Sequence, residues 1–191
     1  MKSPRARSVA GLLASVLCLA FISSVPTGGA GGQAPSRSPG SSKAPSRERT
    51  LRVAREIMTA ARYATMVTTK AGEAQARIVD PLTPDASLVV YVATNPKSRK
   101  VAEIRADPRV TLLYFDTNRL AYVTLVGRAT AVAGEEKATR HKNEWKPFFN
   151  HEQPETYTLY RILPSRLEVV SAKDGLSGDP LTWRPKIVDI R

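Results

Sequence analysis

Residues 87–104, SLVVYVATNPKSRKVAEI, decide the fold of this chain. The continuous apolar run at 87–94 is typical of a strand that is covered on both faces. Asn95 is a favourable helix N-cap, and Pro96 then stands at the first helical position, where proline is preferred. The segment therefore predicts a buried strand that ends at Thr94 and passes directly into a helix.

Cations crowd the start of this predicted helix, where the helix dipole opposes them. A bound phosphate or carboxylate would relieve the conflict by accepting bonds from backbone N–H groups, from the Ser98 hydroxyl and from Arg99 and Lys100. A solvated helix that tolerates a penalty of about a few tenths of a kcal/mol agrees equally well with the residues alone. The pattern leaves these two interpretations open.

The rest of the folded part reads as one helix followed mainly by strands. Thr50 is the expected cap of a helix that ends by Arg62, and the segments 64–69 and 74–79 form a predicted hairpin. Further strands are expected at 110–116, 121–132, 157–163 and 166–172, with a helix from Gly134 to about Trp145. This pattern predicts a mainly β fold with flanking helices, as a closed or nearly closed antiparallel barrel, with a β-sandwich as the alternative.

Composition limits the classes of function. The chain has 191 residues and a formal charge of +12, from 29 Lys and Arg against 17 Asp and Glu, which is one ordinary domain with a tail. A single cysteine excludes a disulfide framework and a cysteine-based zinc site. In residues 51–191 the cations are interspersed with acids, so nucleic acid is not an expected partner. The absence of nucleophile, P-loop and GxGxxG motifs favours chemistry performed by a cofactor.

The N-terminal sequence predicts export. Residues 1–30 have the positive start, the apolar stretch and the small residues of a signal peptide, with cleavage near Ala30 and a secreted or periplasmic product. An N-terminal anchor or a buried helix is the alternative, although the apolar run is short for a stable span. Residues 31–49 are rich in Gly, Ser and Pro and are expected to form a flexible linker, which leaves 50–191 as the folded domain.

The stretch YVATNPKSRKVAEI resembles the phosphate-binding corner of the pyridoxamine 5′-phosphate oxidase-like FMN-binding split barrels. Arg77 in AQARIVD matches an arginine that this family carries on the preceding strand, and YVTLVGRA matches a later glycine-containing strand. The closing WRPKIVDI is similar to the end of the general-stress-protein branch. The resemblance extends from about Leu51 to Ile190 and implies an antiparallel split β-barrel.

This resemblance also implies a cofactor and a set of binding residues. The family binds FMN between two subunits, so a homodimer is expected, and Trp145, Phe148 and Phe149 are possible ring-facing or partner-side aromatics, although burial of a helix end explains them better. The residues expected to bind FMN are Arg77, Ser98, Arg99 and Lys100 at the phosphate, Thr94, Asn95, Ile78 and Val79 along the ribityl chain and ring, and Tyr122 at the flavin.

Two departures from the oxidase limit the function. Leu82 stands where the oxidase has a lysine for the substrate phosphate, and its C-terminal Arg-x-His signature is missing, so the substrate is not expected to be pyridoxamine phosphate. The expected function is that of an exported FMN-dependent oxidoreductase with another small-molecule substrate. The alternatives are a non-catalytic protein that binds or senses flavin or haem, and a deazaflavin-dependent reductase. His141 and His151 are expected to lie in exposed loops, and no metal site is predicted.

Overall fold

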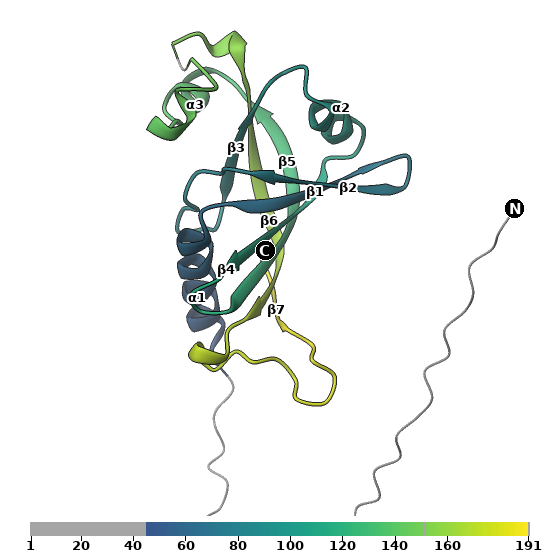
Figure 1. Cartoon of the computed structure of the whole chain (residues 1–191), viewed down its shortest axis with the longest axis vertical. Coiled ribbons are helices and arrows are strands. Elements are labelled where there is room, and N and C mark those ends of the chain that lie inside the picture. Colours follow the sequence, from purple (N-terminus) through teal and green to yellow (C-terminus); the bar gives the residue numbers. More distant parts are fainter. Residues whose placement is uncertain (1–44, 151, 191) are drawn as a thin grey trace, which may run out of the picture. The chain divides into compact units, whose positions relative to one another are not determined.

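The computed structural model of the chain describes residues 45–150 and 152–190. These residues form one antiparallel sheet with helices at its margins (Figure 1). The predicted signal peptide and residues 31–44 of the predicted linker lie outside the described residues, so both remain predictions. In the part of the chain that the structure describes, no helix has the length and apolarity needed to cross a membrane.

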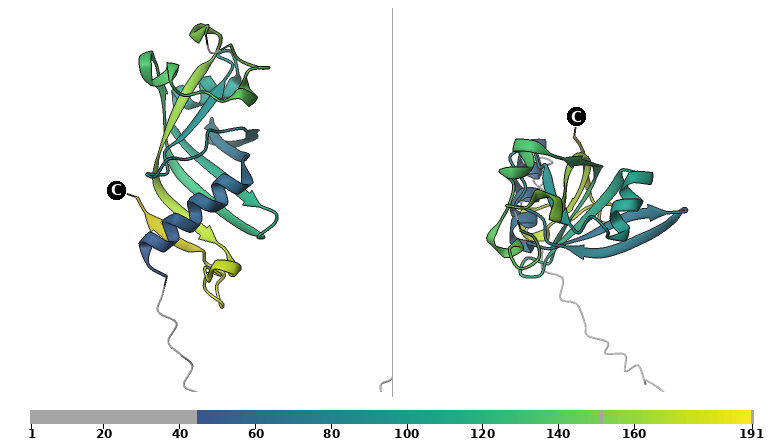
Figure 2. Two further views of the ribbon diagram at one scale, coloured as in Figure 1. Left: turned by 90° about the vertical axis from the view of Figure 1, so that its left-hand side faces the viewer. Right: turned by 90° about the horizontal axis from the view of Figure 1, so that it is seen from above.

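The strands follow the order β2-β1-β4-β5-β6-β3 across the sheet, and β7 also pairs with β6. The sheet curls into a half-barrel (Figure 2), which confirms the predicted split-barrel class, since a sandwich would need two stacked sheets. The strands are β1 (Ala64–Lys70), β2 (Glu73–Val79), β3 (Val90–Thr94), β4 (Arg109–Asp116), β5 (Ala121–Val132), β6 (Thr158–Val170) and β7 (Lys186–Asp189).

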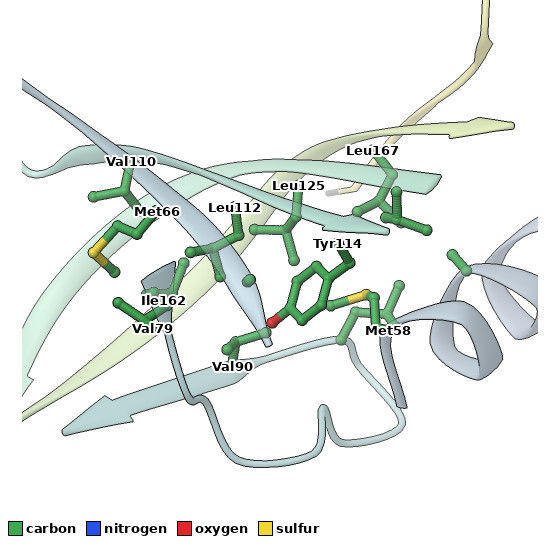
Figure 3. Packing of buried hydrophobic residues seen from close by; sticks show 14 of the residues in the cluster. Met58, Met66, Val79, Val90, Val110, Leu112, Tyr114, Leu125, Ile162 and Leu167 are labelled. Carbon is green, nitrogen blue, oxygen red and sulfur yellow. The ribbon is translucent and has the colours of Figure 1, made fainter. Parts of the chain in front are cut away.

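Alternating residues of these strands build the core. In β4, the side chains of Val110, Leu112 and Tyr114 are buried, whereas those between them lie on the other face of the sheet. Met66 of β1 and Leu125 of β5 point into the same apolar cluster (Figure 3). The opposite face of the sheet therefore carries side chains that do not contribute to this core.

Helix α1 (Arg47–Ala61) covers β4 and β5 and begins one turn earlier than the sequence predicts. Ser46 is the N-cap and accepts a bond from the Arg49 N–H, whereas Thr50, the predicted cap, is buried inside the helix. The first turn is also tied to the C-terminal part of the chain, because Arg49 donates to the Asp174 carbonyl at 2.9 Å. The predicted helix cap at Thr50 was wrong, because Ser46, also a favourable N-cap residue, caps the helix one turn earlier.

The predicted pair of strands around Pro164 is one long strand, β6. Its pairing with β5 shifts register between Val126 and Gly127, opposite Pro164, so the proline lies at an irregularity where its missing N–H breaks no regular ladder. A Cβ at Gly127 would lie 2.5 Å from the Leu163 carbonyl oxygen, so this close approach requires glycine. One edge of β6 pairs with β3 at its start and with β7 near its end.

Two other predicted boundaries change. The strand expected from residue 87 begins at Val90, because the Asp85 carboxylate accepts the N–H groups of Ser87 and Val89 and holds them in a turn. The helix expected from 134 to about 145 is only α3 (Gly134–Ala138), and residues 139–142 are not helical. Short 3-10 turns follow at η1 (Asn143–Trp145), η2 (Pro154–Thr156) and η3 (Ala172–Asp174).

Candidate anion-binding site

The segment from Thr94 to Lys100, here called the corner, begins as a turn and continues into a helix. The Asn95 carboxamide oxygen accepts the Lys97 N–H at 2.8 Å, and the Asn95 carbonyl accepts the Ser98 N–H at 3.0 Å. Helix α2 (Arg99–Ala106) starts after Ser98, which takes the N-cap position that the sequence predicts for Asn95. Asparagine folds readily into such side-chain turns, so a cap and a turn compete for it.

Three polar side chains meet at this corner. The buried Thr94 hydroxyl lies 3.0 Å from the Ser98 hydroxyl and accepts a bond from Lys100 Nζ at 2.7 Å. Burial lowers the pKa of Lys100 and the positive charge of Arg77 lowers it further, while Glu103 opposes both. A lysine whose charge is disfavoured in this way would gain from a bound anion.

Arg77 lies on the inner face of β2 and is held by the protein itself. Its guanidinium donates to the Thr68 hydroxyl and to Glu103 Oε2, both at 2.5 Å, and Thr68 in turn donates to the same carboxylate oxygen. Burial raises the pKa of Glu103, but the bonds from Thr68 and Arg77 outweigh it and the net pKa is lowered. Arg77 therefore lies on the inner side of the corner, and its contact with Glu103 holds it in place.

The charges at this corner do not balance. Glu103 also lies near Arg99, whose Nε is 3.8 Å from Oε1. Oε1 is buried and has no hydrogen-bond partner among the described residues. Arg77, Arg99 and Lys100 thus share one carboxylate, which leaves a formal excess of two positive charges. Such an excess beside a helix start favours a doubly charged anion.

A pocket of about 460 Å³ opens from this corner, between β2, the end of β3 and the segment after α3. One wall is aromatic. Trp145 is buried, and its Nε1 donates to the Asp80 carbonyl at 2.9 Å, whereas Phe148 is 77% exposed. The pocket is lined by Ile78, Val79, Asp80, Ala93, Thr94, Asn95, Ser98, Lys100, Trp145, Phe148 and Phe149.

The structure brings most of the predicted site residues together. Three do not line the pocket: Arg77, which pairs with Glu103 behind it, Arg99, which is 67% exposed and lines a separate groove beside the β1–β2 turn, and Tyr122. The predicted FMN-binding residues that line the pocket are Ile78, Val79, Thr94, Asn95, Ser98 and Lys100. Sequence reasoning missed Glu103 and Thr68; the spacing of four residues between Arg99 and Glu103 was the available signal for the first.

Tyr122 does not line this pocket within one chain. It is the second residue of β5, whereas the end of β5 at Val132 is the part that lies across β6 from Thr94. Tyr122 pairs with Phe115 on the face of the sheet opposite the core.

The structure describes one of the two histidines. Within residues 45–150 and 152–190, no group of three His, Cys, Asp or Glu side chains could hold a metal ion. His141 lies in the loop between α3 and η1 and is exposed, and His151 lies outside the described residues.

The fold is a split barrel: one curled antiparallel sheet whose edge strand leads into a cation-rich helix start, which is a candidate site for an anion. Residues 51–171 match the family model for pyridoxamine 5′-phosphate oxidase. The chain belongs to this family.

Solved structures with similar folds are distant in sequence. General stress protein 26 from Bacillus anthracis is 19% identical with a TM-score of 0.59, over 73% of this chain and 97% of that one. A related protein from Clostridium acetobutylicum is 15% identical with a TM-score of 0.62, over 75% and 96%. A heme binding protein from Mycobacterium smegmatis is 19% identical with a TM-score of 0.54, over 66% and 54%. No curated protein matches the chain.

Proposed function

We propose that the chain binds FMN, with the phosphate at the corner of Thr94, Ser98 and Lys100. The excess of two positive charges around Glu103 is the observation that carries this proposal, because the phosphate of FMN is close to doubly charged at neutral pH. The residues present fit the group: two hydroxyls, an ammonium and the helix start supply donors for its oxygens.

The pocket beyond the corner suits the rest of the cofactor. Ile78 and Val79 supply strand backbone along one side, and the aromatic wall of Trp145, Phe148 and Phe149 shields the opposite side from water. When bound, FMN supplies hydride and electron transfer, so the proposed activity is that of an oxidoreductase acting on a small molecule. The residues of the chain position the cofactor; no catalytic side chain is assigned.

The visible spectrum of the purified protein tests this proposal. We expect the absorption bands of oxidised flavin after incubation with FMN and gel filtration, and bleaching of these bands by NADH or NADPH. Retained flavin that neither nucleotide reduces would favour a non-catalytic binding protein. A protein that rejects FMN but binds a deazaflavin or haem would contradict the proposal in favour of that cofactor.

We also propose a homodimer, supported by the outer face of the sheet. Large apolar side chains lie exposed on this face, where a monomer would expose them to water. Ile78, Thr65, Leu113 and Thr124 form one row across four strands, and Phe115 pairs with Tyr122 beside it. A second copy packed on this face would cover the row and bring its own Tyr122 near the first copy, which is how Tyr122 could reach the flavin.

Replacing Phe115 by Arg tests the dimer. Phe115 is 52% exposed on the outer face, and a buried guanidinium there would be costly, so we expect the dissociation constant of the dimer to rise at least about tenfold. Analytical ultracentrifugation measures the change. The matched control is Leu181→Arg, which puts the same charge on a 90% exposed residue of the loop before β7. A Phe115→Arg variant that remains as dimeric as the control would contradict the interface.

Export remains a proposal that rests on the sequence alone. The charge, apolar core and small residues of 1–30 support a cleaved signal, and the small-residue stretch places cleavage near Ala30. N-terminal sequencing of protein recovered from outside the cytoplasm tests it, and a chain recovered there with residues 1–30 intact would support an anchor instead.

A further inference from the structure

Another pocket, of about 490 Å³, lies between α2 and the sheet, where β5 ends and β6 begins (Figure 1). No residue that lines it also lines the proposed flavin pocket. Helix α2 contributes Val101, Ile104 and Arg105, and the sheet contributes Ala129, Thr158, Tyr160 and neighbouring residues of β5. Pockets that bury small-molecule ligands range over about 300–1,000 Å³, so this one is large enough for such a ligand.

One part of this pocket is apolar. Val101 and Ile104 of α2 and Ala129 of β5 are buried, and they belong to the apolar core cluster. Ala129 and Ala131 lie two residues apart on one strand, so they face the same side of the sheet. Because both side chains are small, an apolar group bound here would lie directly against the edge of the core.

Arg105 is the charged residue of this pocket. Among the described residues, its guanidinium forms no hydrogen bond or ion pair, and no carboxylate lines the pocket. Arg105 stands in the last turn of α2, where the helix dipole favours a cation. That interaction uses none of the N–H donors of the side chain, so they are available to a ligand.

Two hydroxyl groups accompany Arg105. The Tyr160 hydroxyl forms no hydrogen bond with the described residues and, in contrast to that of Tyr114, retains surface that a ligand can reach. Burial raises the pKa of Tyr160 more than the charge of Arg105 lowers it, so the phenol stays protonated and can donate. Thr158 lies two residues before Tyr160 in β6 and faces the same side of the sheet. The polar groups of the pocket therefore suit an acceptor with one negative charge.

We propose that this pocket binds an organic carboxylate with an apolar body. The planar guanidinium of Arg105 matches the two oxygens of a carboxylate, and the hydroxyls of Tyr160 and Thr158 would donate to the same oxygens. The apolar body would contact Val101 and Ile104 and lose its exposure to water. A single cation balances a monoanion, whereas the corner, with its excess of two positive charges, suits a dianion.

Helix α2 separates this pocket from the proposed flavin site. Lys100 and Val101 are neighbours in α2, yet they line different pockets. Binding of the carboxylate depends on Arg105 and not on the corner, so this proposal does not rest on the binding of FMN. Because Lys100 and Arg105 are both cations of one helix, the experiment must show which of them the anion contacts.

Titration with 2-naphthoate tests the site on flavin-free protein. We expect saturable binding by isothermal titration calorimetry, with affinity at least about tenfold weaker in Arg105→Gln, which removes the charge from an exposed side chain. Tyr160→Phe, which loses only the hydroxyl, should weaken binding at least about threefold. Arg128→Gln, on the exposed opposite face of β5, and Lys100→Ala, at the corner, are the matched controls and should bind the probe within about twofold of the wild type.

Several results would overturn the inference. These are no saturable binding to the wild type, equal affinity in Arg105→Gln, an equal loss in Arg128→Gln, or equally tight binding of the neutral analogue 2-naphthamide. A loss in Lys100→Ala as large as that in Arg105→Gln would place the probe at the corner and overturn it as well. Because the titration contains no flavin, a failure here leaves the FMN proposal standing, and a protein that rejects FMN but binds the probe through Arg105 leaves this site standing.

Discussion

We expect Lys100→Ala to weaken the binding of FMN by about ten- to a hundredfold, because a bond from a charged donor to phosphate typically contributes about 1.5–3 kcal/mol. Among the described residues that line the pocket, Lys100 has the only ammonium, and its Nζ already donates to the Thr94 hydroxyl at the end of β3. Riboflavin lacks the phosphate, so its affinity should change much less. Fluorescence titration of both flavins measures the two effects on the same protein.

Two matched variants show whether the effect is local. Lys97→Ala removes the same kind of charge three residues earlier, from an exposed side chain outside the pocket, and should change FMN affinity little. Arg99→Ala should weaken FMN binding by an amount between these two, since Arg99 and Glu103 both line a neighbouring groove. Equal losses in Lys97→Ala and Lys100→Ala would show that only the overall charge matters, and the phosphate corner would then be wrong.

The strands of this fold could be predicted because their signal is local. Segments such as 110–116 and 121–132 alternate or run apolar, and a β-sheet needs little more than this period to fix which face is buried. The corner after β3 was also visible, because an apolar run, Asn-Pro and a cluster of cations follow one another directly. The split barrel itself came from a family resemblance and not from periodicity.

The parts that could not be predicted depend on long-range contacts. The ion pair of Arg77 with Glu103, 26 residues away, could not be predicted, because no local pattern pairs a strand arginine with a helix glutamate. The phosphate contact of Arg77 stays a prediction. The hydrogen bond from Arg49 in the first turn of α1 to the Asp174 carbonyl, 125 residues away, likewise leaves no local pattern. For Tyr122, sequence position alone did not show that it lies on the outer face, because that follows from its register with Phe115.

Glu103→Ala is expected to destabilise the fold by about 3–5 kcal/mol, because it leaves a buried guanidinium without a counter-charge. The side chains of Arg77 and Glu103 are only 15% and 3% exposed, and their atoms lie 2.5 Å apart. Urea denaturation of the flavin-free protein measures the loss. The control is Asp107→Ala, which breaks the ion pair with Arg109, whose side chain is 75% exposed, and should cost at most about 1 kcal/mol.

Acid should remove the same stabilisation in the wild type. The pKa of Glu103 in the folded protein lies below its ordinary value of 4.5, so its contribution is complete above that value and is lost as the pH falls through the lowered pKa. The stability of the wild type should therefore drop below about pH 4.5, while that of Glu103→Gln should fall less over the same range. Parallel pH profiles would show that Glu103 does not titrate differently in the folded and unfolded chain.

A double variant separates the ion pair from the packing around it. Replacing a buried pair by apolar residues of similar volume is often neutral, whereas breaking it is not, so Arg77→Met with Glu103→Leu should recover most of the stability that Glu103→Ala loses. The same double variant removes Arg77 as the inner wall of the corner. If Arg77 contributes to the phosphate site, this stable protein binds FMN more weakly than the wild type while riboflavin is unaffected; if Lys100 alone suffices, both flavins bind as before.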